Sequence, residues 1–157
     1  MSTFSTILVY GIPASLLLSV VIAGMGLTNP RLLLRSYPKN VQAVVRPMSE
    51  REMRQTLSWV IPFWFLLGGF PAAAALAVKA SNQDFLFIFL SAFGSIFLFH
   101  LVDWLILYTT MPTFVVLAGT EGMAGYKNYA MHFKGVLIGP VLPGIIGLIV
   151  AGIVVFV

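Results

Sequence analysis

The feature that most constrains the fold of this chain is a set of four long apolar stretches. They cover about residues 5–27, 57–79, 85–111 and 135–157, and each has the ~20 residues that a helix needs to cross a bilayer. Only 9% of the 157 residues are charged and the mean hydropathy is +0.98, whereas soluble domains carry about 25% charged residues. The sequence therefore predicts an all-α integral membrane four-helix bundle, a single transmembrane domain over residues 1–157.

The basic residues gather in the two longer loops between these spans. Loop 28–56 holds six of them and loop 112–134 holds two, while Lys79 is alone on the opposite side. Basic loops are retained in the cytoplasm. We therefore expect both loops to be cytoplasmic and both termini to lie outside.

The net charge of +4 does not indicate a nucleic-acid partner, because the basic residues follow the membrane topology. Arg31, Arg35, Lys39 and Arg46 instead suggest two alternatives: general contact with headgroups, or a specific site for anionic lipid. The chain has no cysteine, which excludes disulfides, thiolate catalysis and cysteine metal sites.

Two local patterns predict structure within the loops. Ser49 and Glu52 have the spacing of a capping box, so the second helix should begin before its membrane-spanning part. Gly119, Gly122 and Gly125 recur every three residues in the second loop. Such glycines suit either a flexible connector or a folded cap over the mouth of the bundle.

The third span carries ionisable residues, which at membrane depth indicate a functional site. His100 and Asp103 are three residues apart and share a helix face, and Tyr108 follows. One alternative is a structural ion pair between Asp103 and a loop cation; another is a proton relay or polar substrate pocket. A mixed metal site with Glu121 and His132, or haem bound by the two histidines, is also compatible; the sequence requires no cofactor.

Helix faces are predicted from residues that recur every four positions. On the third span, the polar pair shares one helix face with four phenylalanines, Phe85, Phe89, Phe93 and Phe97, so this face should point into the bundle. The opposite face should contact lipid through Leu98, Leu101 and Leu105. Small residues recur in the same way on the fourth span and should pack against the phenylalanines or mediate homo-oligomers; they are Gly135, Gly139, Pro143, Gly147 and Ala151. A second small ridge is expected on the second span, formed by Gly69, Ala73 and Ala77.

Two loop stretches resemble a group of small bacterial multi-pass membrane proteins with no assigned activity. Residues 29–42 carry Asn-Pro-Arg, Tyr-Pro and Val-Gln, and residues 119–133 carry Gly-Thr-Glu-Gly, Gly-Tyr and His-Phe. The resemblance implies a bacterial inner-membrane location.

Two functional hypotheses follow. The first is a non-catalytic membrane protein that binds lipid, especially anionic headgroups, or a larger membrane assembly. The alternative is a small membrane enzyme or transporter with a polar site at the cytoplasmic mouth, such as a site that binds metal or protons.

Overall fold

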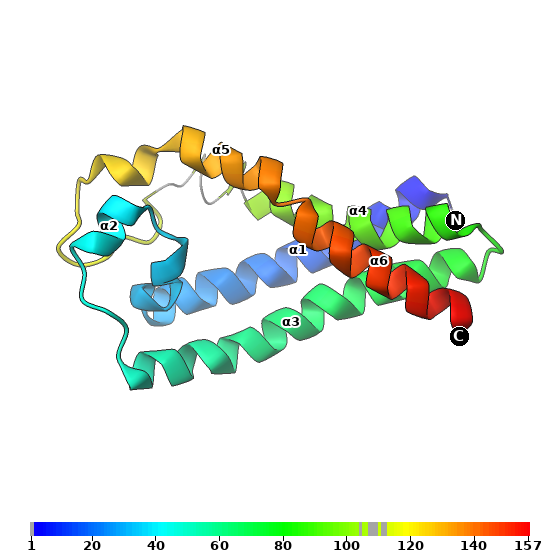
Figure 1. The fold of residues 1–157 in the computed structure, drawn as a ribbon, viewed down its shortest axis with the longest axis horizontal. Helices are drawn as coiled ribbons and strands as arrows, with labels where there is room; N and C mark the ends of the chain where they lie inside the picture. The colour runs from blue at the N-terminus through cyan, green and yellow to red at the C-terminus, as the bar shows by residue number, and fades with distance from the viewer. Residues whose placement is uncertain (1, 104, 107–109, 111–112) are drawn as a thin grey trace.

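The computed structural model describes residues 2–103, 105–106, 110 and 113–157. Within them, four helical segments are long and apolar enough to cross a membrane, which confirms the predicted all-α architecture of a multi-pass membrane protein. They are α1 (Thr3–Thr28), α3 (Glu50–Lys79), α4 (Phe85–Asp103) and the pair α5 (Tyr129–Ile138) and α6 (Val141–Phe156). Both termini lie at one end of the bundle, and the two longer loops meet at the other (Figure 1).

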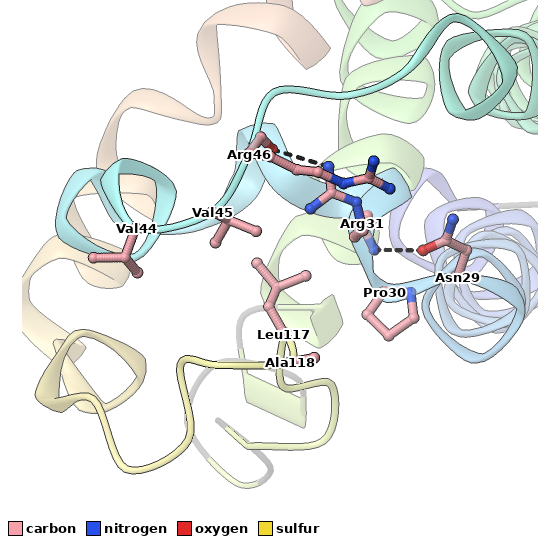
Figure 2. A pocket seen from close by; sticks show the side chains of 8 residues that line it. All are labelled: Asn29, Pro30, Arg31, Val44, Val45, Arg46, Leu117 and Ala118. Carbon is pink, nitrogen blue, oxygen red and sulfur yellow. Dashed lines mark hydrogen bonds between the residues drawn. The ribbon is translucent and has the colours of Figure 1, made fainter.

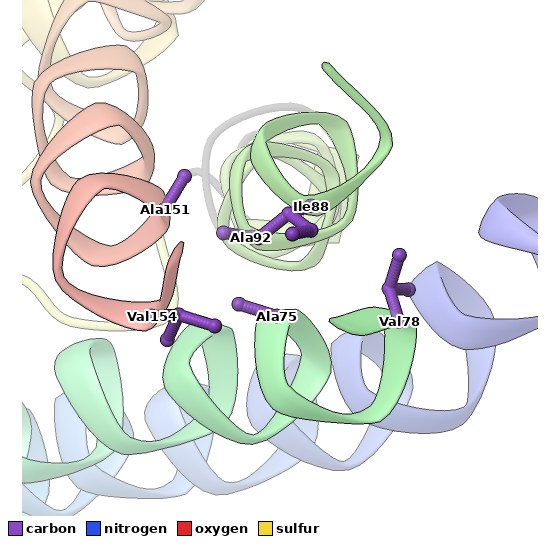
Figure 3. Packing of buried hydrophobic residues seen from close by; sticks show 6 residues of the cluster. All are labelled: Ala75, Val78, Ile88, Ala92, Ala151 and Val154. Carbon is purple, nitrogen blue, oxygen red and sulfur yellow. The ribbon is translucent and has the colours of Figure 1, made fainter. Parts of the chain in front are cut away.

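Helices α3 and α4 form the centre of the bundle, because they contact each other and each of them contacts both α1 and α6. One buried cluster joins three of these helices: Ala75 and Val78 from α3, Ile88 and Ala92 from α4, and Ala151 and Val154 from α6. Figure 3 shows these side chains converging between the three helices. Small side chains dominate the cluster, as expected where close packing rather than exclusion from water joins helices in lipid.

The small ridge of α6 packs closely against α4, as predicted. A Cβ atom placed on Gly147 would lie 3.2 Å from the backbone Cα and N of Phe93. Ala151, one turn on, is fully buried, and Phe89 packs against its cluster. Gly135, at the start of the predicted ridge, has no atom within 4 Å of such a Cβ position, because α5 diverges from the bundle in Figure 1.

The inward face of α4 differs from the predicted one. Its buried residues are Ile88, Ser91, Ala92, Ser95, Ile96 and Phe99. With Phe85 at 0° and ~100° per residue, these residues centre near 310°, while Phe89, Phe93 and Phe97 lie at about 40–120° on the flank toward α6. Leu98 also departs from the prediction: its Cδ2 would be 3.1 Å from a Cβ on Gly11, so it contacts α1. Leu101 and Leu105 are exposed, as predicted.

Helix α3 also presents a different ridge from the predicted one. Gly69 is exposed, and the buried face instead contains Leu67, Pro71, Ala74, Ala75 and Val78. At the end of α3, Lys79 Nζ donates hydrogen bonds to the carbonyl oxygens of Val154 (2.7 Å) and Val155 (3.4 Å) at the end of α6. The positive charge of Lys79 therefore lies next to the negative, C-terminal end of the α6 dipole, which is a favourable interaction.

The third span is described as far as Asp103 in α4, and residues 105–106 and 110 are π-helical. The other residues of its predicted end, up to 111, lie outside the described residues. The fourth span begins at Tyr129 rather than residue 135 and is interrupted between α5 and α6. The cause is Pro140, because it lacks the amide hydrogen that would continue the helical hydrogen bonds, although Gly139 and Pro140 both keep helical dihedral angles.

The two loops fold together into one cap, which we define as residues 29–49 and 113–128. The first contains η1 (Pro30–Ser36) and α2 (Lys39–Ala43), and the second contains η3 (Ala124–Lys127). Leu34, Val41, Leu117 and Tyr126 form its buried core. The structure thus favours the folded cap over a flexible connector, and it explains two glycines of the second loop: Gly119 and Gly122 have φ of +83° and +77°.

A buried tyrosine organises the second half of the cap. The Tyr126 hydroxyl accepts a hydrogen bond from the Leu117 amide (3.0 Å) and lies 2.6 Å from Thr120 Oγ1. Its ring meets that of Tyr37 edge-on, at 5.7 Å between centroids. The Tyr37 hydroxyl donates to the carbonyl of Val115 (3.1 Å). Tyrosine hydroxyls therefore satisfy loop backbone groups that regular secondary structure leaves unpaired.

Candidate functional site

The cap is joined to α3 by an arginine–glutamate pair. Arg31 Nε lies 2.6 Å from Glu52 Oε1, and Arg31 Nη2 donates to the carbonyls of Arg46 (2.9 Å) and Pro47 (3.0 Å). Glu52 also completes the predicted capping box with Ser49. Arg31, one of the loop cations that could have paired with Asp103, therefore pairs with Glu52.

Glu52 lies in the first turn of α3, before the stretch 57–79 that the sequence predicts to cross the membrane. The hydrogen bond from Arg31 lowers the pKa of its carboxyl to about 2, and bonds from the Ser49 backbone and side chain act in the same direction. Glu52 is thus ionised at neutral pH. Because two of Arg31's three nitrogens are engaged by Glu52, Arg46 and Pro47, the orientation of its guanidinium is fixed.

A pocket of about 490 Å³ opens beside this network. Its lining comes from the start of η1, the end of α2 with the residues after it, and the second loop; the residues are Asn29, Pro30, Arg31, Val44, Val45, Arg46, Leu117 and Ala118. Figure 2 shows both arginines above the apolar side chains of Val45 and Leu117. The pocket therefore combines cationic donors with an apolar wall.

Arg31 and Arg46 alone among the four predicted lipid-binding cations line this pocket. Arg35 and Lys39 are exposed elsewhere on the cap. The Arg46 side chain remains 72% exposed, and its Nη2 is 3.8 Å from Glu52 Oε1. Sequence reasoning missed the apolar wall, because Val44, Val45 and Leu117 come together only when two loops about 70 residues apart pack on each other.

The second candidate, inside the bundle, is built on the last turn of α4. His100 faces the break between α5 and α6: a Cβ on Gly139 would lie 3.3 Å from its Cε1 and 3.4 Å from its Nδ1. Asp103 Oδ1 is buried, and among the described residues nothing donates a hydrogen bond to it. Tyr108, the third predicted member, lies outside the described residues.

The described residues contain no group of three or more histidines, aspartates or glutamates that could hold a metal ion. Glu121 is exposed in the cap, where its Oε1 accepts a hydrogen bond from the Gly119 amide (3.1 Å). The side chain of His132 lies outside what the structure describes. Of the predicted set, the structure thus describes the side chains of His100, Asp103 and Glu121, and it does not test the part of His132.

Comparisons with protein-family models, with curated proteins and with solved structures find no match to this chain. The site is interpreted from its own geometry.

Proposed function

We propose that this chain is a non-catalytic multi-pass membrane protein whose cap pocket binds the phosphate headgroup of an anionic lipid. The observation that supports this most is the position of Arg46, an exposed guanidinium at the edge of a pocket with an apolar wall. Guanidinium groups bind phosphate oxygens with paired hydrogen bonds. The apolar wall formed by Val44, Val45 and Leu117 suits the glycerol and first methylenes of a lipid.

The two arginines of the pocket have different roles in this proposal. The Glu52 carboxylate offsets the charge of Arg31 at 2.6 Å, whereas its contact with Arg46 is looser, at 3.8 Å. Arg46 therefore supplies the positive charge for the ligand. Arg31 donates a hydrogen bond to the carbonyl oxygen of Arg46 and so positions that segment of the cap.

The depth of the pocket fits a headgroup. Helix α1 has 26 residues, about 39 Å at 1.5 Å per residue, which exceeds the ~30 Å hydrocarbon core. Asn29 and Pro30 follow directly after its last residue, which supports a position of the pocket at the level of the lipid headgroups. Arg35 and Lys39, exposed on the same cap, add to the attraction, at about 1 kcal/mol for each basic residue near an anionic surface.

The cap is proposed to face the cytoplasm of a bacterial inner membrane. Eight of the nine basic residues lie toward the cap end, and Lys79 lies near the termini. The positive-inside rule supports this orientation, and the resemblance of residues 29–42 and 119–133 to small bacterial membrane proteins supports the bacterial inner membrane. Reporter fusions after Val157 should be active outside the cytoplasm, and a reporter inserted near Asn40 inside it; the reverse pattern would contradict the orientation.

Arg46→Gln should weaken binding of anionic lipid. Losing a hydrogen bond to a charged group costs about 1.5–3 kcal/mol, which is roughly a 10- to 100-fold loss of affinity. The measurement is the rise in melting temperature of delipidated protein in detergent, titrated with short-chain phosphatidic acid, phosphatidylglycerol or phosphatidylcholine.

The control is Arg35→Gln, which removes an exposed cation outside the pocket and should retain most of the shift. Glycerol phosphate, which lacks acyl chains, separates a phosphate site from a lipid site. Equal stabilisation by phosphatidylcholine, or an unchanged affinity in Arg46→Gln, would argue against the proposal.

A further inference from the structure

Asp103 is a half-buried acid whose Oδ1 atom is buried, and it has no counter-ion among the described residues. Its Oδ1 receives no hydrogen bond from the described residues, and the ion pairs that they form both involve Glu52. Asp103 lies 18 residues after Phe85, about 27 Å along an ideal helix, and therefore near the cap end of the bilayer core. An ionised carboxylate in such a place is costly unless it is paired, so the neutral acid is favoured.

The helices around Asp103 provide few groups to pair with it. Helix α3 has no Asp, Glu, His, Lys or Arg between Arg54 and Lys79, α6 has none, and Tyr10 is the one titratable side chain of α1. Helix α5 carries Tyr129, His132 and the exposed Lys134. On the cap side, Arg31 is already bonded to Glu52.

The environment one turn earlier on α4 is apolar. Phe99 is buried in a cluster with Leu18, Leu67 and Ile96, and its ring meets that of Phe63 at 6.1 Å between centroids. His100 is the nearest ionisable neighbour along the helix, and it lies against the break at Gly139. On the side of Asp103 that faces the end of the bundle with the two termini, packed aromatic and aliphatic side chains therefore lie between its carboxyl group and water.

The cap end is different in its backbone geometry. Asp103 is the last residue of α4, and residues 105–106 and 110 are π-helical, a geometry that often marks functional sites. Helix α5 diverges beyond the break at Gly139 (Figure 1). We propose that Asp103 is a proton-binding site within the membrane, which takes up a proton from water at the cap end and releases it there. The ligand is the proton itself, and the step converts a carboxylate into a carboxylic acid.

The chain permits a test that leaves Asp103 intact. It has two aspartates, Asp84 and Asp103, so Asp84→Asn leaves Asp103 as the only aspartate. This variant, made with carboxyl-¹³C aspartate and reconstituted in phosphatidylcholine vesicles, is examined by infrared difference spectroscopy over a pH series. We expect the labelled group to show the carbonyl band of a protonated acid at pH 7, to shift that band in deuterium oxide, and to lose it reversibly at higher pH.

Asp103→Asn in the unlabelled protein should lack the band, while Asp84→Asn retains it. A labelled group that is already a carboxylate at pH 7 would overturn the proposal. So would an acid band that neither shifts in deuterium oxide nor responds to pH while the protein stays folded, because such a proton would be fixed rather than bound reversibly. Neither result depends on lipid binding to the cap pocket.

Discussion

Gly147→Leu is expected to destabilise the bundle substantially, because α6 meets the backbone of α4 at this residue. A Cβ there would lie 3.2 Å from Phe93 Cα and N and 3.3 Å from Phe89 Cε2. Backbone atoms do not yield as a flexible side chain does, so the two helices must separate. Overpacking of this kind costs about 1–3 kcal/mol and occasionally more, measured as a lower melting temperature in detergent.

Gly152→Leu is the matched control on the same helix. A Cβ on Gly152 has no atom within 4 Å, so the added side chain should extend into lipid with little change in melting temperature. If the two variants melted at the same temperature, the α4–α6 contact would not be the close one described here.

Tyr126→Phe is expected to loosen the cap by about 1–3 kcal/mol, the cost of leaving a buried donor unsatisfied. The hydroxyl accepts from the Leu117 amide and contacts Thr120 Oγ1, and both residues are 1% exposed. The phenyl ring still fills the space, so the loss isolates the hydrogen bonds. Hydrogen exchange of residues 113–128 should accelerate while exchange in the membrane helices stays unchanged.

The control for this variant is Tyr129→Phe, which removes a hydroxyl from a tyrosine that is 47% exposed and should leave exchange in the cap unchanged. Unaltered exchange in Tyr126→Phe would contradict the role assigned to its hydroxyl. Faster exchange throughout the protein would instead indicate that the cap and bundle unfold together.

Apolar length and local spacing were enough to predict the architecture. Stretches of ~20 apolar residues can be satisfied in lipid by helices, so the four spans follow from hydropathy alone. The close packing of Gly147 and Ala151 follows from their four-residue spacing, and the start of α3 from the Ser49–Glu52 capping box. Each of these features depends on residues close together in the chain.

The rotation of α4 could not be read from its phenylalanines, because large apolar side chains suit lipid as well as a neighbouring helix. The better signal was Ser91, Ala92 and Ser95, all fully buried, since small residues mark helix contacts in membranes. Pro140 was a visible signal for the break in the fourth span. The Arg31–Glu52 pair and the cap pocket depend on how two loops fold against each other, which no local pattern encodes.

Native mass spectrometry of the protein released from its own membranes tests the central claim, anionic headgroup binding at Arg46, most directly. Wild type should retain a phospholipid with an anionic headgroup, Arg35→Gln should retain it too, and Arg46→Gln should lose most of it. Equal retention by wild type and Arg46→Gln, or retention of zwitterionic lipid alone, would contradict the proposed site.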